Sequence, residues 1–335
     1  MPMDDPDKAP DASPARADTF TITADQSHAD TRLDMMVAVS RGCSRKLAAS
    51  LIKNGDILVD ERQAKPAHRV TPGETISGVI LARPEFLPAA EPIPLDILLE
   101  DDDLLVINKA PGMIVHPAAG HFSGTLVNAL LHHYPEIAQV GDPTRPGIVH
   151  RLDRYTSGIL VIARNPEAHE RLTLMFKERA VAKTYLALVY GTMASAEGGI
   201  DLPIGRHPTH RKKMGVVGDN AMRDARTLWR TRKRFPDATF LELDIKTGRT
   251  HQIRVHCTAL GHPVVGDPLY TKRWTGKQRH FSSRAAFESL STAPRQMLHA
   301  WRIAFNHPIK DVPIALSTPL ARDFQQLLIK LHQSK

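Results

Sequence analysis

The sequence predicts an α+β protein with two domains of unequal size. We expect a small α/β domain near the N-terminus and a larger domain with a mixed, mainly antiparallel β-sheet and peripheral helices. Three observations lead to this prediction. The 335 residues exceed the roughly 150 typical of one domain. Prolines cluster at residues 84–94, between a short helix-rich region and a longer C-terminal region. This longer region holds many short apolar runs without regular alternation of strand and helix.

Residues 1–20 are acidic and proline-rich, so we expect a disordered tail there. Over residues 21–83 we expect two helices and a small sheet. Apolar residues recur with helical spacing in two stretches, and Ser44 and Gly55 are suited to begin and end the second helix. Residues 57–59 follow as a strand, with turns predicted at 60–61 and 70–74.

Basic residues lie on or beside this second helix, away from its apolar positions: Arg41, Arg45, Lys46 and Lys53. This basic face is a candidate for binding an anionic partner. A solvated helix face explains the segment equally well when it is taken alone.

Four prolines make residues 84–94 a stiff linker. The large domain is expected over residues 95–327, followed by a short C-terminal tail at 328–335. Helices are predicted near 126–133 and 167–178. Short strands are predicted at 97–99, 104–107, 148–149, 159–163, 184–190, 240–245 and 303–305.

Composition restricts the function classes. Lys and Arg total 44 against 36 Asp and Glu, a formal net charge of +8, so nucleic acid is a candidate partner. No apolar run is long enough to span a membrane and no secretory leader begins the chain, so we expect a cytoplasmic protein with no membrane partner. The two cysteines, Cys43 and Cys257, form no CxxC pair, and we predict no metal site.

Motifs for phosphate-bearing cofactors are missing. The chain has no GxxxxGK[ST] and no GxGxxG between a strand and a helix, so we predict no cofactor. The acidic residues 100–103 would suit a metal-dependent nuclease only if they converged on one point. Adjacent residues point in different directions, so a hairpin turn is the better interpretation.

The strongest local pattern is GIVHRLDRYTSG at 147–158, directly before the apolar run at 159–163. A polar, glycine-bounded loop between two strands can hold one carboxylate, Asp153, at a sheet edge. The alternative is that Asp153 only hydrogen-bonds within its own turn, as Asp often does in loops.

A second pattern is TGRTHQIRVHCTALG at 247–261. We expect Thr250 to cap a helix that ends at Gly261 and that turns Ile253 and Cys257 inward. Arg254 would flank this inner face, where its guanidinium suits a buried carboxylate. A surface arginine is the alternative.

Together the two segments resemble the HRLDxxTSG and TGRxHQIRVH signatures of the RluA/RluD family of RNA pseudouridine synthases. The resemblance extends over about residues 31–318 and is strongest for the RluD branch, which modifies large-subunit ribosomal RNA. Other motifs of that branch are NK at 108–109, VHP at 115–117, GTLVNAL at 124–130, RHP at 206–208 and GHPVVGD at 261–267.

The resemblance implies an S4 RNA-binding module at residues 21–83 and a cofactor-free isomerase. By it, Asp153 is the nucleophile, Tyr185 stacks on the target uracil and Arg254 pairs with Asp153. An aromatic residue in a strand is more often core packing, so the role of Tyr185 depends on the family. Attack at C1′, attack at C6 and elimination all remain open.

RNA affinity is expected to come mostly from phosphate contacts. Residues 205–235 hold ten basic residues against two Asp and are the main candidate surface, with a solvated basic strand as the alternative. Residues 271–296 are a second candidate. The individual RNA-binding candidates are Arg45, Lys46, Lys53, His150, Arg151, Arg206, Arg211, Lys212, Lys213 and Arg249.

The sequence therefore predicts a monomeric enzyme that converts uridine to pseudouridine in large-subunit ribosomal RNA after flipping the base out of its stack. The alternative from another class is an RNA-binding or ribosome-assembly factor that has the same fold without catalysis. The presence of Asp153, Tyr185 and Arg254 argues against that alternative.

Overall fold

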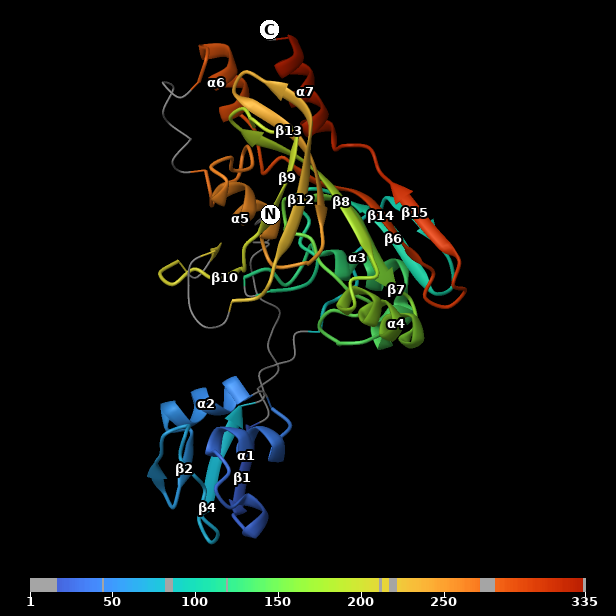
Figure 1. Cartoon of the computed structure of the whole chain (residues 1–335). Coiled ribbons are helices and arrows are strands. Elements are labelled where there is room, and N and C mark those ends of the chain that lie inside the picture. Colours follow the sequence, from blue (N-terminus) through green and yellow to red (C-terminus); the bar gives the residue numbers. More distant parts are fainter. Residues whose placement is uncertain are drawn as a thin grey trace, which may run out of the picture. The chain divides into compact units, whose positions relative to one another are not determined.

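A computed structural model describes residues 17–43, 45–81, 87–118, 120–210, 213–216, 222–271 and 281–333. The chain forms two compact units, Met1–Phe86 and Leu87–Lys335 (Figure 1). No helix among the described residues is both long and apolar enough to cross a membrane.

The first unit has two helices, α1 (Leu33–Ser40) and α2 (Arg45–Asn54), and a short 3-10 helix, η1 (Gln26–His28). Its antiparallel sheet has the strand order β1-β4-β2-β3. The strands are β1 (Ala17–Thr23), β2 (Ile57–Val59), β3 (Arg62–Gln63) and β4 (Thr75–Leu81). The two expected helices and the strand at 57–59 are present.

One boundary differs from the prediction. Strand β1 begins at Ala17, inside the segment expected to be a tail, and pairs with β4 along its whole length. The strand forms because Phe20 and Ile22 alternate with polar residues and reach the core of this unit. The predicted tail over residues 1–16 lies outside the described residues.

Asp34 ties the two helices of this unit together. Its buried carboxylate accepts hydrogen bonds from Arg32 of the preceding segment, at 3.0 and 2.8 Å, and from Arg45 at the start of α2, at 3.2 Å. The bonds from Arg32 outweigh the effect of burial and hold the pKa of Asp34 below its ordinary value.

The second unit is built on a nine-stranded sheet with the order β5-β6-β7-β14-β8-β13-β12-β9, and β15 also pairs with β14. Among the described residues, β7 and β14 pair in parallel and the other neighbours are antiparallel. The strands are β5 (Ile97–Glu100), β6 (Leu104–Lys109), β7 (Ser157–Ala163), β8 (Ala182–Tyr190), β9 (Glu197–Asp201), β12 (Arg226–Phe235), β13 (Ala238–Ile245), β14 (Leu298–Asn306) and β15 (Pro313–Ser317).

Helices and a small hairpin surround this sheet (Figure 1). The hairpin pairs β10 (Gly205–Arg206) with β11 (Met214–Gly215). The helices are α3 (Leu126–His133), the 3-10 helix η2 (Pro135–Gln139), α4 (Pro166–Lys177), α5 (Gln252–Ala259), α6 (Arg284–Ser291) and α7 (Arg322–Gln333).

Strand β7 is buried on both faces, which explains its uninterrupted apolar sequence. Leu160 and Ile162 join the core that contains α3 and α5, whereas Ile159 and Val161 join the core that contains α4. The mixed, mainly antiparallel sheet with peripheral helices confirms the predicted fold class. The predicted strand at 148–149 is reduced to one bridge, between Ile148 and Ile162.

Candidate active site

Asp153 lies in the loop that leads into β7. The Thr156 N–H donates to the Asp153 carbonyl at 3.0 Å and closes a turn. Gly158 then pairs with Ala300 of β14 at a φ of +110°, and a Cβ atom there would lie 2.2 Å from the Ala300 carbonyl oxygen. The glycine of the sequence pattern is therefore needed for the close approach of the two strands.

Three side chains from two segments of the chain fix this loop. Lys109 Nζ donates to the Arg154 carbonyl at 3.2 Å, Arg295 Nη1 to the Tyr155 carbonyl at 2.9 Å, and Gln296 Nε2 to Thr156 Oγ1 at 3.1 Å. Burial, followed by the charge of Arg295, lowers the pKa of Lys109 to about 7. The backbone that follows Asp153 is thus held by buried polar contacts.

Arg254 on α5 bridges two carboxylates. Its Nη1 donates to Asp153 Oδ2 at 2.8 Å, while its Nε and Nη2 donate to Asp267 Oδ2 and Oδ1 at 2.6 and 3.0 Å. Burial alone lowers the pKa of Arg254, but the bonds and charge of Asp267 and the charge of Asp153 outweigh this effect and raise it. The guanidinium therefore stays charged and is directed at Asp153.

The helix that carries Arg254 begins differently from the prediction. Its N-cap residue is His251, at a left-handed φ of +57°, and no side chain caps the helix there, so Thr250 is not the cap. The Gln252 amide oxygen instead accepts the Arg249 N–H at 3.0 Å and the Thr247 hydroxyl at 2.7 Å. Arg254 is also more buried than expected, at 3% exposure, because Asp267 compensates its charge.

Tyr185 on β8 faces the same space. It lies opposite Leu243 of β13 and Ala300 of β14, and only 8% of it is exposed. Burial, followed by the negative charge of Asp153, raises the pKa of its phenol, which therefore remains protonated at neutral pH. Its ring forms a wall of the pocket rather than only core packing.

His251 is a pocket residue that the sequence reasoning did not single out. Its Nε2 lies 3.9 Å from Asp153 Oδ2, and its Nδ1 lies 3.0 Å from the Tyr270 hydroxyl. Burial lowers the pKa of His251 more than the nearby Asp153 raises it. The ring is therefore neutral near pH 7.

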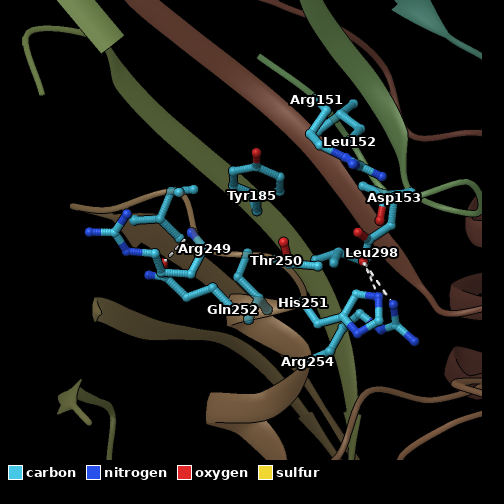
Figure 2. Close-up of a pocket in the computed structure, with 14 residues that line it drawn as sticks. Arg151, Leu152, Asp153, Tyr185, Arg249, Thr250, His251, Gln252, Arg254 and Leu298 are labelled. Carbon is cyan, nitrogen blue, oxygen red and sulfur yellow. Dashed lines mark hydrogen bonds and ion pairs between the residues drawn. The ribbon is translucent and has the colours of Figure 1, made fainter. Parts of the chain in front are cut away.

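These side chains line one pocket of about 110 Å³ (Figure 2). Figure 2 shows Asp153 beside Arg254 and His251, with Tyr185 and Arg249 farther along the same cavity. The chemistry available is one carboxylate, one fixed cation, one aromatic ring and one neutral imidazole. The full lining is Arg151, Leu152, Asp153, Thr156, Tyr185, Ile245, Gly248, Arg249, Thr250, His251, Gln252, Ile253, Arg254 and Leu298.

A second, larger pocket adjoins the first and shares Gly248, Arg249 and Thr250 with it. Arg206 of β10 and Arg223 also line this second pocket. Arg223 was not among the individual RNA-binding candidates. Arg206, Arg223 and Arg249 form a basic approach beside the first pocket, which suits a phosphate backbone.

The other RNA-binding candidates are dispersed. Arg151 is exposed at the pocket. Lys213 Nζ lies 5.7 Å from the centre of the Tyr270 ring. Lys53 is exposed on α2, in the first unit. Arg45 is half exposed with its Nε on Asp34. Arg211, Lys212 and the side chain of Lys46 lie outside the described residues.

His150 does not line the pocket. Its Nε2 accepts the Val161 N–H at 2.9 Å, and its ring stacks on Phe176 at 4.4 Å. Burial, followed by the charge of Lys183, lowers the pKa of His150 to about 3. The ring is uncharged at neutral pH and already hydrogen-bonded to Val161, so it offers no cation to RNA. This observation argues against the RNA contact predicted for His150.

The basic run at 230–234 is largely engaged within the protein. Arg232 pairs with Glu242 at 2.6 Å, and Arg234 donates to the carbonyls of residues 193–195. Lys233 contacts His332 of α7. These contacts favour the alternative of a basic strand for this part of residues 205–235. Of the second candidate surface, residues 272–280 lie outside the described residues.

The acidic residues 100–103 form the hairpin turn between β5 and β6, as expected. Asp101 accepts the N–H groups of Asp103 and Leu104, both at 2.9 Å, and pairs with Lys310 at 3.0 Å and His307 at 2.8 Å. The Asp101 carboxylate is thus occupied by neighbouring donors.

Comparison with known proteins gives a consistent result. The family model described as RNA pseudouridylate synthase matches residues 103–259, and that of the S4 domain matches residues 31–76. The chain is 40% identical to the ribosomal large subunit pseudouridine synthase D of Nitrosomonas europaea, over 96% of this chain and 91% of that protein. It is 43% identical to the Xanthomonas campestris protein of the same name, over 87% of this chain and 85% of that protein.

Solved structures agree. Human RNA Pseudouridylate Synthase Domain Containing 1 is similar with a TM-score of 0.53 and 28% identity, over 72% of this chain and 96% of the human chain. Human RNA Pseudouridylate Synthase Domain Containing 4 is similar with a TM-score of 0.54 and 26% identity, over 71% of this chain and 93% of the human chain.

Proposed function

The chain belongs to the RNA pseudouridine synthases, and we propose that it isomerises uridine in large-subunit ribosomal RNA with Asp153 as the nucleophile. The observation that carries this proposal is the convergence of Asp153, Arg254 and Tyr185 on one pocket. The substrate class is taken from the names of the relatives in Nitrosomonas and Xanthomonas.

The proposed roles follow from the geometry. The target uridine leaves its stack and enters the pocket, where the Tyr185 ring replaces part of the lost stacking. Arg254 directs the Asp153 carboxylate into the pocket through the 2.8 Å hydrogen bond from its Nη1. These roles hold for attack at C1′, for attack at C6 and for elimination.

RNA binding is proposed to use the basic approach beside the pocket. Arg206, Arg223 and Arg249 line the adjoining pocket, and Arg151 is exposed at the first one. Their guanidinium groups would contact phosphates on either side of the flipped nucleotide. The S4 domain would add a second contact through α2, where Lys53 is exposed.

We further propose that the enzyme acts as a monomer in the cytoplasm, with ribosomal RNA, free or in assembling subunits, as its partner.

The test is to map pseudouridine in large-subunit ribosomal RNA by carbodiimide-dependent primer extension. RNA that lacks the modification is incubated with the protein without added metal. New stops at discrete uridines with the protein, and none with Asp153→Asn, are expected. Unmodified RNA after incubation with the wild-type protein would contradict the proposed substrate. Bound but unchanged RNA would favour the assembly-factor alternative.

A further inference from the structure

Helix α7 is connected through Arg295 to the loop that carries Asp153. The Arg295 side chain is buried, and its Nε and Nη2 donate to Asp323 Oδ2 and Oδ1 at 2.6 and 2.8 Å. Asp323 lies in the first turn of α7, and its Oδ1 also accepts the Phe324 N–H at 2.8 Å. The guanidinium and the carboxylate therefore hold each other in one orientation at the start of this helix.

The third nitrogen of the guanidinium faces the loop. Arg295 Nη1 donates to the Tyr155 carbonyl at 2.9 Å. Gln296, the next residue, donates from Nε2 to Thr156 Oγ1 at 3.1 Å. Two successive side chains thus bind two successive residues of the loop, 140 residues away in the sequence. Arg295 and Gln296 are 4% and 2% exposed, so water competes little for these hydrogen bonds.

These contacts fix the backbone at Asp153. The Thr156 N–H donates to the Asp153 carbonyl at 3.0 Å and closes a turn that contains Tyr155. A shift of the Tyr155 carbonyl would therefore rotate the peptide units from which the Asp153 side chain extends. Arg254 binds the tip of that side chain, through the 2.8 Å hydrogen bond to Oδ2. The direction of the carboxylate thus depends on the turn as well as on Arg254.

The negative charge of Asp323 is needed because a second buried amine lies under the same loop. Lys109 is 1% exposed and donates from Nζ to the Arg154 carbonyl at 3.2 Å. Burial raises the pKa of Asp323, but the hydrogen bond and charge of Arg295 outweigh this effect and hold the pKa below its ordinary value. Asp323 is therefore ionised at neutral pH and compensates a guanidinium that is removed from water.

We propose that Asp323 and Arg295 are positioning residues for the isomerisation, and that helix α7 fixes the loop of Asp153 through this pair. Neither residue is among those that line the catalytic pocket, so the pair acts through the loop and not on the substrate. The inference rests on the proposed role of Asp153 as the nucleophile. Loss of the pair slows the chemical step and leaves RNA binding in place, because the arginines beside the pocket are unchanged.

The test uses two variants of the full-length protein. Asp323→Asn keeps the size of the side chain and removes its charge, whereas Arg295→Lys keeps the charge and removes the planar fork. The matched control is Asp101→Asn. Asp101 likewise pairs with a cation, Lys310, and accepts backbone N–H groups, but it lies in the turn before β6, at the opposite end of that strand from Lys109.

Three quantities are measured for each protein. They are the single-turnover rate of uridine conversion in large-subunit ribosomal RNA, the dissociation constant for that RNA, and hydrogen exchange of the peptide that covers residues 151–158. The midpoint of thermal unfolding is recorded for each variant, and the rates are measured well below the lowest midpoint. Slow conversion therefore cannot result from unfolded protein.

We expect Asp323→Asn and Arg295→Lys each to slow conversion by about 10-fold or more, since small misplacements of a catalytic group have effects of this size. Affinity for the RNA should stay close to that of wild type. Exchange over residues 151–158 should become faster, because the Thr156 N–H loses protection when the turn is released. Asp101→Asn should match wild type in rate, affinity and exchange, even if its unfolding midpoint falls as far.

A wild-type rate in folded Asp323→Asn would overturn the proposal. Slow conversion with unchanged exchange over residues 151–158 would overturn it as well, because the pair would then act somewhere other than the loop. Equal slowing in Asp101→Asn would assign the loss to general stability instead. If Arg295→Lys does not fold, the isosteric Asp323→Asn decides the question.

Failure of the proposed function has a different signature. In that case the wild-type protein converts no uridine in this RNA, or Asp153→Asn retains activity.

Discussion

Arg254 donates two hydrogen bonds to the fully buried carboxylate of Asp267, at 2.6 and 3.0 Å, on the side of the guanidinium away from Asp153. Asp267 also accepts the N–H groups of Leu269 and Tyr270, so its own position is fixed by the chain that follows it. Asp267 therefore determines where the guanidinium that faces Asp153 lies. This two-sided pairing also compensates a charge that is removed from water.

Substitution Asp267→Asn should lower kcat about 10- to 100-fold with little change in KM. The amide keeps one acceptor but removes the charge that positions Arg254, and small misplacements of catalytic groups have effects of this size. Steady-state kinetics on uridine-containing RNA measures both constants. A rise in KM with unchanged kcat would mean that Asp267 acts on RNA binding instead.

Tyr185→Phe should retain most of the activity, whereas Tyr185→Leu should lose about 1–3 kcal/mol of stacking on the target base. The aromatic ring and not the hydroxyl group is the part that replaces base stacking. Comparing kcat/KM for the two variants measures the difference. Equal loss in both variants would assign the chemistry to the hydroxyl group.

Arg206→Ala and Arg249→Ala should each weaken the salt dependence of RNA binding. The logarithm of the RNA association constant falls as the logarithm of the salt concentration rises, and this slope should become less steep by about 0.7, the value for one phosphate contact on a single strand. Both residues line the pocket next to the catalytic one. Filter binding over a range of salt concentrations gives the slopes. Arg171→Ala on α4, whose side chain pairs with Glu167, is the control and should leave the slope unchanged.

His150 should make the protein less stable in mild acid. The folded-state pKa of about 3 lies below the ordinary value of 6.5, so between these values the unfolded chain binds more protons and the free energy of unfolding falls as pH falls. At pH 5 this one group should cost about 2 kcal/mol relative to pH 7. Urea unfolding at both pH values measures the loss.

His150→Gln is the comparison for this effect, because glutamine has an oxygen that can accept the Val161 N–H and does not titrate. Its stability should fall less than that of wild type between pH 7 and pH 5. The same fall in both proteins would assign the acid sensitivity to other groups.

The sequence allowed the fold class and the apolar strands to be predicted, because burial on one or both faces of a sheet leaves a periodic or continuous apolar pattern. Strand β7 is the clearest example, with both faces covered. Strand β12 was considered only as the alternative interpretation of the basic residues 205–235, because basic residues alternate along its exposed face, while Thr227 and Trp229 are buried on the other. The tail predicted at 328–335 is wrong over residues 328–333, which belong to α7. This helix was missed because the helical spacing of its buried residues, Phe324, Leu327 and Leu331, was not used.

The site was predictable where a motif holds its residues close in sequence. Asp153 and Arg254 lie in the two long patterns, and their contact is present. The partner carboxylate Asp267 lies 13 residues after Arg254 in the chain, and only the GHPVVGD pattern at 261–267 pointed to that region. His251 Nδ1 lies 3.0 Å from the Tyr270 hydroxyl, 19 residues further along the chain, and such a contact leaves no periodic signal in a sequence.

The most direct test of the central claim is tritium release from large-subunit ribosomal RNA labelled at C5 of uridine, measured together with RNA binding. Wild-type protein should release tritium without added metal or cofactor. Asp153→Asn should bind the RNA nearly as well and release none above background. Tritium release by Asp153→Asn would contradict the assignment of Asp153 as the nucleophile.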